Sequence, residues 1–145
     1  MDVQQPSTSP PEILAPAGNK ASFLAAIAAG ADAVYCGLKL FSARMEAKNF
    51  TVEEVTALVG LAHKKGIKVF VAVNSVLKPD DLMRAGQFLD LLQRRVKPDA
   101  VIVQDLGMVS LIKQTGFSGE VHLSTLANVS FPAALQVIRQ HLQVD

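Results

Sequence analysis

The chain alternates short apolar runs with amphipathic segments, and this alternation predicts a repeated strand–helix unit. The unit is clearest around residues 99–107. Ala100 to Val103 are apolar, too few for a buried helix and rich in β-branched residues, which is typical of a strand covered on both faces of a parallel sheet. Polar Gln104 and Asp105 follow where this run stops. Because the carboxyl ends of parallel strands carry the chemistry of α/β folds, we expect these two side chains at a functional edge.

The same unit occurs five times along the chain. Strands are expected at residues 12–15, 31–36, 67–73, 100–103 and 121–125. Helices are expected at residues 19–30, 51–66, 79–92, 107–114 and 130–142. Asn19 is a predicted N-cap, and Thr51 with Glu54 forms a predicted capping box. Right-handed βα units in this order predict a parallel sheet.

Such a sheet can be doubly wound or can belong to a (β/α)8 barrel. A dinucleotide-binding sheet would need a glycine-rich phosphate loop after the first strand, and Pro16-Ala17-Gly18 is not one. We therefore expect an α/β fold that is a partial TIM (β/α)8 barrel. A full barrel typically takes about 250 residues, so 145 residues hold about five parallel βα units. Residues 1–11, rich in Pro, Ser, Thr and Gln, are expected to be a disordered tail before the barrel part at 12–145.

Composition narrows the function classes. The formal net charge of +1 gives no global attraction to nucleic acid or to an anionic membrane. A single cysteine excludes an internal disulfide and cannot by itself hold zinc or an iron–sulfur cluster. No apolar run approaches the roughly 20 residues of a membrane span, and the N-terminus lacks the features of a secretory signal. A cytoplasmic protein without membrane contacts is expected.

Several ordered motifs resemble a known family. These are Glu12-Ile-Leu-Ala-Pro-Ala-Gly18, Gly30-Ala-Asp-Ala-Val-Tyr35, Phe41-Ser-Ala-Arg44, Asn49-Phe50, Val71-Ala-Val-Asn74, Asp99-Ala-Val-Ile-Val-Gln-Asp-Leu-Gly107 and His122-Leu-Ser-Thr125. Each motif is weak alone, but the ordered set, over roughly residues 12–135, resembles the N-terminal half of the peptidase U32 family of collagenase-like proteases. The resemblance implies a barrel at the N-terminus of a longer protein.

The resemblance also implies three possible functions. The first is a peptidase, a hydrolase of the U32 family, here present as an N-terminal fragment. The second is an enzyme that hydroxylates RNA or a small molecule, because several family members take part in such reactions and some hold an iron–sulfur cluster through downstream cysteines. The third is an inactive structural or binding half. Cys36 falls where the family more often has glycine, so we expect this segment to bind no cofactor.

The predicted site lies at the strand tips. Asp105 and His122 are the expected catalytic residues. The expected substrate-binding residues, for a peptide or an RNA, are Arg44, Asn49, Asn74, Gln104 and Ser124. Arg44 and Asn49 belong to a long loop between Phe41 and Phe50, and long loops in compact domains are often functional. A guanidinium there suits a phosphate or carboxylate, although it can equally pair with a structural carboxylate.

Three chemical interpretations of this site remain open. Ser124, His122 and Asp105 could form a nucleophilic triad, but no G-x-S-x-G sequence surrounds Ser124. His122, Asp105 and Asn74 could hold a metal ion for hydrolysis, although no known ligand spacing is present, so no metal ligand is predicted. The same residues could instead bind substrate or one another. Finally, a half barrel leaves apolar faces and open edges, which predicts self-association.

Overall fold

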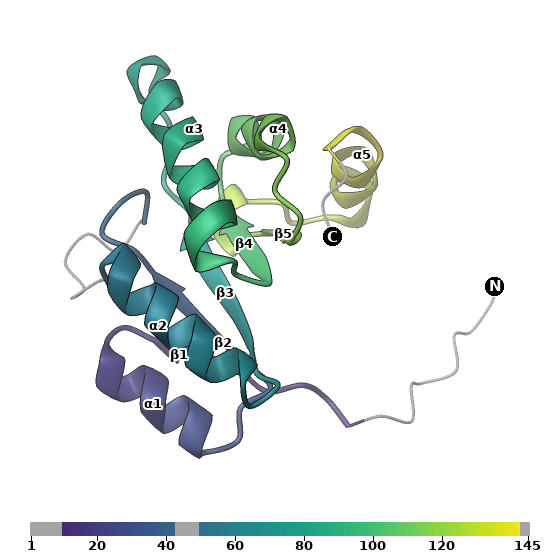
Figure 1. Ribbon diagram of the computed structural model, residues 1–145. Helices are drawn as coiled ribbons and strands as arrows, with labels where there is room; N and C mark the ends of the chain where they lie inside the picture. The colour runs from purple at the N-terminus through teal and green to yellow at the C-terminus, as the bar shows by residue number, and fades with distance from the viewer. Residues whose placement is uncertain (1–9, 43–49, 143–145) are drawn as a thin grey trace.

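The computed structural model describes residues 10–42 and 50–142, in which parallel strands alternate with α-helices (Figure 1). The strands are β1 Leu14–Ala17, β2 Ala33–Gly37, β3 Lys68–Val73, β4 Ala100–Val103 and β5 Glu120–Leu123. The α-helices are α1 Lys20–Ala28, α2 Val52–His63, α3 Leu82–Leu91, α4 Leu106–Thr115 and α5 Pro132–Leu142. Two 3-10 turns, η1 Pro79–Asp81 and η3 Thr125–Ala127, and one π-helical turn, η2 Leu92–Val96, complete the described elements.

The order of the strands distinguishes a doubly wound sheet from a (β/α)8 barrel. The sheet runs β1-β2-β3-β4-β5, and each neighbouring pair is parallel. A doubly wound sheet reverses its strand order at a switch point, whereas a barrel adds strands in chain order. The chain therefore has an α/β fold with the arrangement of a partial TIM barrel, as the hydrophobic pattern predicted.

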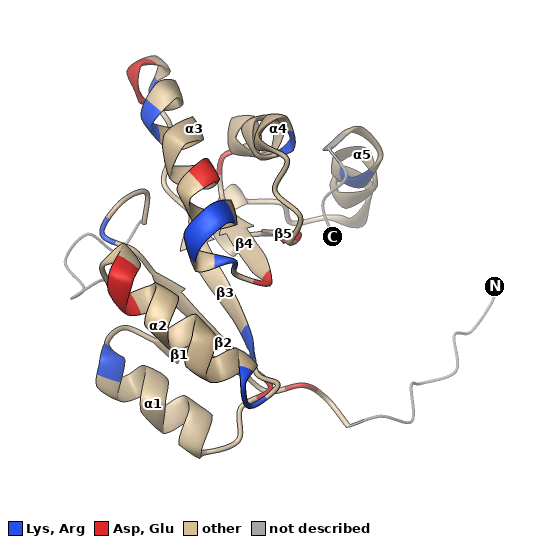
Figure 2. Cartoon of the chain, viewed as in Figure 1, with Lys and Arg blue, Asp and Glu red and all other residues tan. Residues whose placement is uncertain are grey.

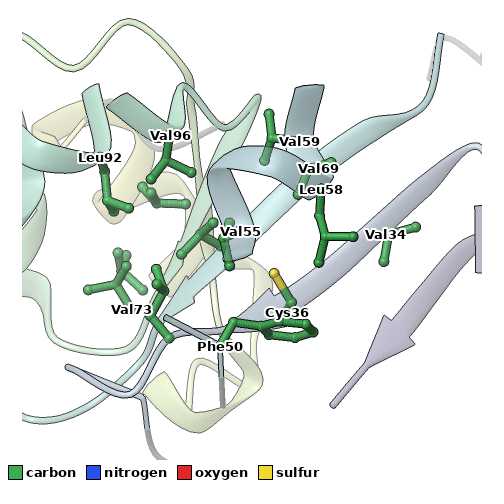
Figure 3. Packing of buried hydrophobic residues seen from close by; sticks show 14 of the residues in the cluster. Val34, Cys36, Phe50, Val55, Leu58, Val59, Val69, Val73, Leu92 and Val96 are labelled. Carbon is green, nitrogen blue, oxygen red and sulfur yellow. The ribbon is translucent and has the colours of Figure 1, made fainter. Parts of the chain in front are cut away.

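The sheet has two faces of different character. On the helix face, Val34, Val69 and Val101 belong to one large core cluster that also takes residues from all five α-helices. Figure 3 shows part of this cluster, in which α2 lies against the strands. On the opposite face, here called the inner face, Phe70 packs with Ala33 and Ala100 in a separate, smaller cluster. Successive strand residues alternate between these faces, so the same five strands supply both.

Most predicted helix ends are confirmed at the level of hydrogen bonds. The Asn19 side chain accepts from the Ser22 amide at 2.9 Å and caps α1. The Thr51 hydroxyl accepts from the Glu54 amide at 3.2 Å, while the Glu54 carboxylate accepts from the Thr51 amide at 2.9 Å. This is the reciprocal capping box expected for α2. Gly116 closes α4 with a left-handed φ of 70°, which a side chain would strain.

The first strand corrects one prediction. We expected a strand at 12–15, yet β1 begins at Leu14 and runs through Pro16 to Ala17. The Ile13 carbonyl accepts from the Ala33 amide, which directs the hydrogen-bonding groups of odd-numbered β1 residues toward β2. The missing N–H of Pro16 therefore faces the open edge, where proline is tolerated.

Two aspartates fasten the amino ends of the strands. The Asp32 carboxylate accepts from the Ile13 amide at 2.7 Å, and the Asp99 carboxylate accepts from the Val69 amide at 2.7 Å. Each aspartate precedes an Ala-Val pair that begins β2 or β4, so the sequence repeats the device. His63 also contacts Asp99, with Nε2 at 2.9 Å from the carboxylate. Figure 2 colours the positions of charged residues along the ribbon, and most of these positions lie on helices and connecting segments rather than within the strands.

The long loop after β2 has a fixed base. Leu38 and Phe50 form an isolated parallel bridge and are both buried. The Phe50 amide donates to the Gly37 carbonyl at 3.2 Å, and the Lys39 amide donates to the Phe50 carbonyl at 3.2 Å. The two ends of the loop are thereby held beside the carboxyl end of β2. The predicted tail at 1–11 lies outside the described residues except for its last two positions.

Candidate substrate site at the carboxyl edge of the sheet

A concavity of about 630 Å³ opens at the carboxyl ends of the strands, where the sequence predicted the site. Its described lining combines apolar, aromatic, amide, hydroxyl and imidazole groups from all five strands and the segments after them. The lining residues are Leu14, Pro16, Ala17, Gly18, Tyr35, Cys36, Gly37, Ser42, Ala72, Asn74, Ile102, His122, Leu123, Ser124, Thr125 and Leu126. Such a mixed concave surface at this edge is the usual position of a ligand site in a barrel.

The register of the strands explains which side chains reach this concavity. His122 pairs with Ile102 and Ile102 with Ala72, which aligns these residues across three neighbouring strands. Tyr35 pairs with Phe70 one layer closer to the amino ends. All five residues belong to the inner face because they alternate with the helix-face valines. The inner face thus delivers ring side chains and small residues to one place.

His122 is held by two neighbours. Its Nε2 atom lies 2.8 Å from Oε2 of Glu120, and its ring meets Phe70 edge to face with centroids 4.8 Å apart. The His122 side chain is 28% exposed, whereas that of Glu120 is 59% exposed. The imidazole is therefore partly shielded and has a defined orientation, which suits a group that exchanges a proton with a ligand.

Ser124 occupies a capping position. Its hydroxyl accepts from the Leu126 amide at 3.2 Å, as the N-cap of η3, and its own amide donates to the Val103 carbonyl at 2.7 Å. Backbone and side chain thus tie the turn after β5 to the end of β4. The predicted partners His122 and Ser124 both line the concavity, and each has its own hydrogen bond elsewhere.

Asp105 is engaged in the same way. One carboxylate oxygen accepts from the Gly107 amide at 2.8 Å as the N-cap of α4, and the other accepts from the Leu77 amide at 2.9 Å. The carboxylate therefore joins β4, α4 and the loop after β3. Asp105 and the half-buried Gln104 are not among the described residues that line the concavity. The structure brings Asn74, His122 and Ser124 together there and gives Asp105 a different set of partners.

Two predicted binding residues cannot be placed. Arg44 and Asn49 lie outside the described residues. Their binding roles stay predictions, supported by the position of the loop base. Sequence reasoning missed Glu120, Gly18 and Ser42, the last of which is a buried polar side chain in the lining. The signal for Glu120 was its spacing of two from His122, because residues two apart on a strand share a face.

Cys36 does not suit an iron–sulfur cluster. Its side chain lies on the helix face, where Figure 3 shows it among Phe50, Val55 and Leu58. Burial without a compensating charge raises the pKa of the thiol from 9.0 to about 12. Within the described part of the chain, no three His, Cys, Asp or Glu side chains gather where they could hold a metal ion. The described residues therefore provide no ligand set for a cluster or a metal ion.

No helix in the described part of the chain is long and apolar enough to cross a membrane.

A parallel barrel arc with a concavity at its carboxyl edge defines a barrel-type α/β domain. Residues 18–143 match the family model described as peptidase family U32, and the chain therefore belongs to that family. In the solved structure of a U32 peptidase, 52% of the chain superposes on 85% of this one, with a TM-score of 0.66 and 18% sequence identity. That likeness concerns the fold.

The names of the curated relatives describe either a protease or an enzyme that hydroxylates RNA. An uncharacterized protease of Methanocaldococcus jannaschii is 41% identical over 119 residues, which are 82% of this chain and 28% of the relative. A collagenase of Porphyromonas gingivalis is 36% identical, over 86% of this chain and 30% of the relative. A 23S rRNA 5-hydroxycytidine C2501 synthase of Escherichia coli is 44% identical, over 69% of this chain and 15% of the relative. The chain spans less than a third of each relative, and both predicted functions, protease and hydroxylating enzyme, are compatible with the family.

Proposed function

We propose that this chain forms the substrate-binding wall of a U32 enzyme that modifies RNA, with His122 as the group that exchanges a proton with the bound base. The observation that carries the proposal is the chemistry of the concavity. Ring side chains, an amide and hydroxyls line it, which suits a planar heterocycle held by stacking and a few hydrogen bonds. The relationship to the rRNA hydroxycytidine synthase supports this substrate class.

The hydrogen-bond partners of the possible triad residues favour RNA modification over hydrolysis by a serine nucleophile. A serine nucleophile needs a base within hydrogen-bond reach, and that base needs an orienting carboxylate. Here His122 pairs with Glu120 rather than with Ser124 or Asp105, and both oxygens of Asp105 accept from backbone amides. Of the two residues predicted to be catalytic, we retain His122 in that role and propose that Asp105 is a positioning residue.

The remaining predicted residues have roles in binding under this proposal. Asn74 and Ser124 contact the substrate in the concavity, while Arg44 and Asn49 contact it from the loop after β2, where a guanidinium suits a phosphate. Gln104 contributes at the rim. The net charge of +1 means that phosphate contacts come from such local groups rather than from the whole surface. We also propose that the enzyme works in the cytoplasm, where its RNA substrate is.

A peptidase is the second candidate function. The names of the Methanocaldococcus and Porphyromonas relatives favour it, and His122 could activate a water molecule in the same concavity. An inactive binding half is the third interpretation, in which His122 has no chemical role.

One experiment separates the three. The gene that encodes the full protein is deleted and complemented with wild type or with His122→Gln, and nucleosides of tRNA and rRNA are measured by mass spectrometry. The proposal expects a hydroxylated nucleoside that disappears on deletion and returns only with wild type. In parallel, the purified full protein is incubated with collagen and peptide libraries. Cleavage that depends on His122, with unchanged RNA, would establish the peptidase instead, and unchanged results in both assays would favour the inactive half.

A further inference from the structure

Glu120, which the predicted site did not include, forms a pair with His122 on the inner face of β5. Glu120 lies opposite Ala100 and His122 opposite Ile102. In the first of these rows, from β1 to β5, Glu120 follows Pro16, Tyr35, Phe70 and Ala100, so it is the one carboxylate in a row of otherwise uncharged residues. Although the Glu120 side chain is 59% exposed, it has a specific partner on the same face, since His122 lies two positions along the strand and contacts it at 2.8 Å.

The contact determines where the imidazole carries its proton. An ionised carboxylate can only accept hydrogen bonds, so Nε2 of His122 must be the donor. In the neutral ring, Nδ1 is then the atom with the lone pair. The edge-to-face contact with Phe70, at an interplanar angle of 87°, restricts rotation of the His122 ring, so that Nε2 remains the nitrogen next to Glu120.

The strands that flank the pair present no competing charge. On β4 the neighbours are Ala100 and Ile102, and on β3 the aligned residues are Phe70 and Ala72. None of these side chains titrates. Among the described residues of these aligned rows, Glu120 is therefore the group that can select the tautomer of His122.

We infer that Glu120 is a positioning residue, which fixes His122 as the Nε2–H tautomer and so makes Nδ1 the atom that accepts a proton from the substrate. The chemical role of Nδ1 rests on the proposed function, whereas the tautomer does not. Glu120 thus corresponds to an orienting carboxylate of the kind that supports a catalytic histidine in other enzymes.

The test uses the full protein labelled with 15N-histidine, at a pH where the imidazole is neutral. Long-range 1H–15N correlations identify the tautomer, and the signal that is lost in His122→Gln is assigned to His122. The wild type is expected to hold the Nε2–H form. In Glu120→Lys the ammonium can only donate, so the ring should invert to the Nδ1–H form. In Glu120→Ala, His122 should show a mixture of the two tautomers, as an unrestrained imidazole does.

Glu53→Lys is the matched control, because it makes the same charge change at an exposed glutamate in the first turn of α2. It should leave the His122 tautomer as in wild type. An Nδ1–H wild type, or the same tautomer in wild type and Glu120→Lys, would overturn the inference. If the tautomer inverts, activity in the assay above should fall roughly 100-fold, the usual scale for general acid–base catalysis. Inversion without loss of activity would overturn the role of Nδ1 and count against the proposed function, while the pairing itself would stand.

Discussion

The helix face and the inner face of the sheet are made by the same strands, yet they are packed very differently. On the helix face, valines of four strands interlock with residues such as Phe23, Leu89 and Met108, which are fully buried. On the inner face, Ala33, Phe70 and Ala100 form a small buried cluster, against which Tyr35 and Ile102 pack partly, and Ala72 is buried beside it. Alternating side chains along each strand thus separate a continuous core from a thin layer.

This difference in packing indicates which residues can have a functional role without being part of the main core. The helix face buries apolar area against five α-helices, and such burial is the main favourable contribution to folding. The inner face buries fewer side chains, and its His122 and Tyr35 line the concavity. Function can therefore use the inner face without a large loss of stability, and the following changes test that separation.

The largest effect is expected in assembly. The inner face and the open edges of the sheet predict that the 145-residue chain self-associates. Ile102→Lys places a charge in the middle of the inner face and should abolish that association. Leu61→Lys makes the same change on the outer side of α2, where Leu61 is 37% exposed, and should not. Light scattering that finds a monodisperse wild-type monomer at tens of micromolar would contradict the prediction.

Truncation of one isoleucine on each side measures the difference in stability directly. Ile112 of α4 is 2% exposed in the helix-face core, and Ile102 is half-buried on the inner face. Ile112→Ala should lower the free energy of unfolding by about 2–5 kcal/mol, and Ile102→Ala by less than about half as much. Urea unfolding of both variants gives the comparison. Equal losses would show that the inner face carries as much stability as the core.

The amino edge of the sheet should depend on its aspartates. Asp99→Ala removes the acceptor for the Val69 amide and for His63, and should cost about 1–3 kcal/mol because a backbone donor loses its partner. Asp90→Ala is a suitable control, since Asp90 forms an exposed pair with Arg94, which is worth at most about 0.5 kcal/mol. Denaturant unfolding distinguishes them, and similar values for the two variants would refute a special role for Asp99.

A smaller effect is expected at Asp105 if it positions rather than reacts. Asp105→Ala should lower stability by about 1–2 kcal/mol through the loss of the α4 cap and the Leu77 contact. Asp105→Asn keeps one acceptor oxygen, so it should retain most of the stability and most of the activity. A complete loss of activity in a stably folded Asp105→Asn protein would restore the carboxylate to the catalytic set.

The smallest effect is expected from thiol reagents at neutral pH. Because burial raises the pKa of Cys36 to about 12, its thiolate fraction at pH 8 is roughly one in ten thousand, and it should resist alkylation in the folded protein. The unfolded chain ionises this thiol near its ordinary value of 9.0. Stability from the buried thiol is therefore complete below pH 9 and is lost as the pH rises toward 12. Rapid labelling at pH 8 without unfolding would contradict the buried position.

The comparison also explains how much of the site was predictable. Apolar runs and capping residues predicted the strands, most helix ends and the barrel arrangement, because hydrophobic period and hydrogen bonding at helix ends are local properties. His122 and Asn74 were placed correctly at the concavity because strand tips converge in this fold. The partners of Asp105 were not predictable, since one of its hydrogen bonds comes from Leu77 in a different βα unit.

By itself, the sequence determined the α/β class, the parallel repeat and membership in peptidase family U32, because periodicity and ordered motifs are written along the chain. Only the tertiary structure decided which polar side chains form hydrogen bonds between segments of the fold and which line the concavity. Asp32, Asp99 and Asp105 hold amides of neighbouring segments, and Glu120 holds His122. The reason is physical: a carboxylate takes its role from the donor brought within about 3 Å of it, and for Asp32, Asp99 and one oxygen of Asp105 that donor is 19 to 30 residues away.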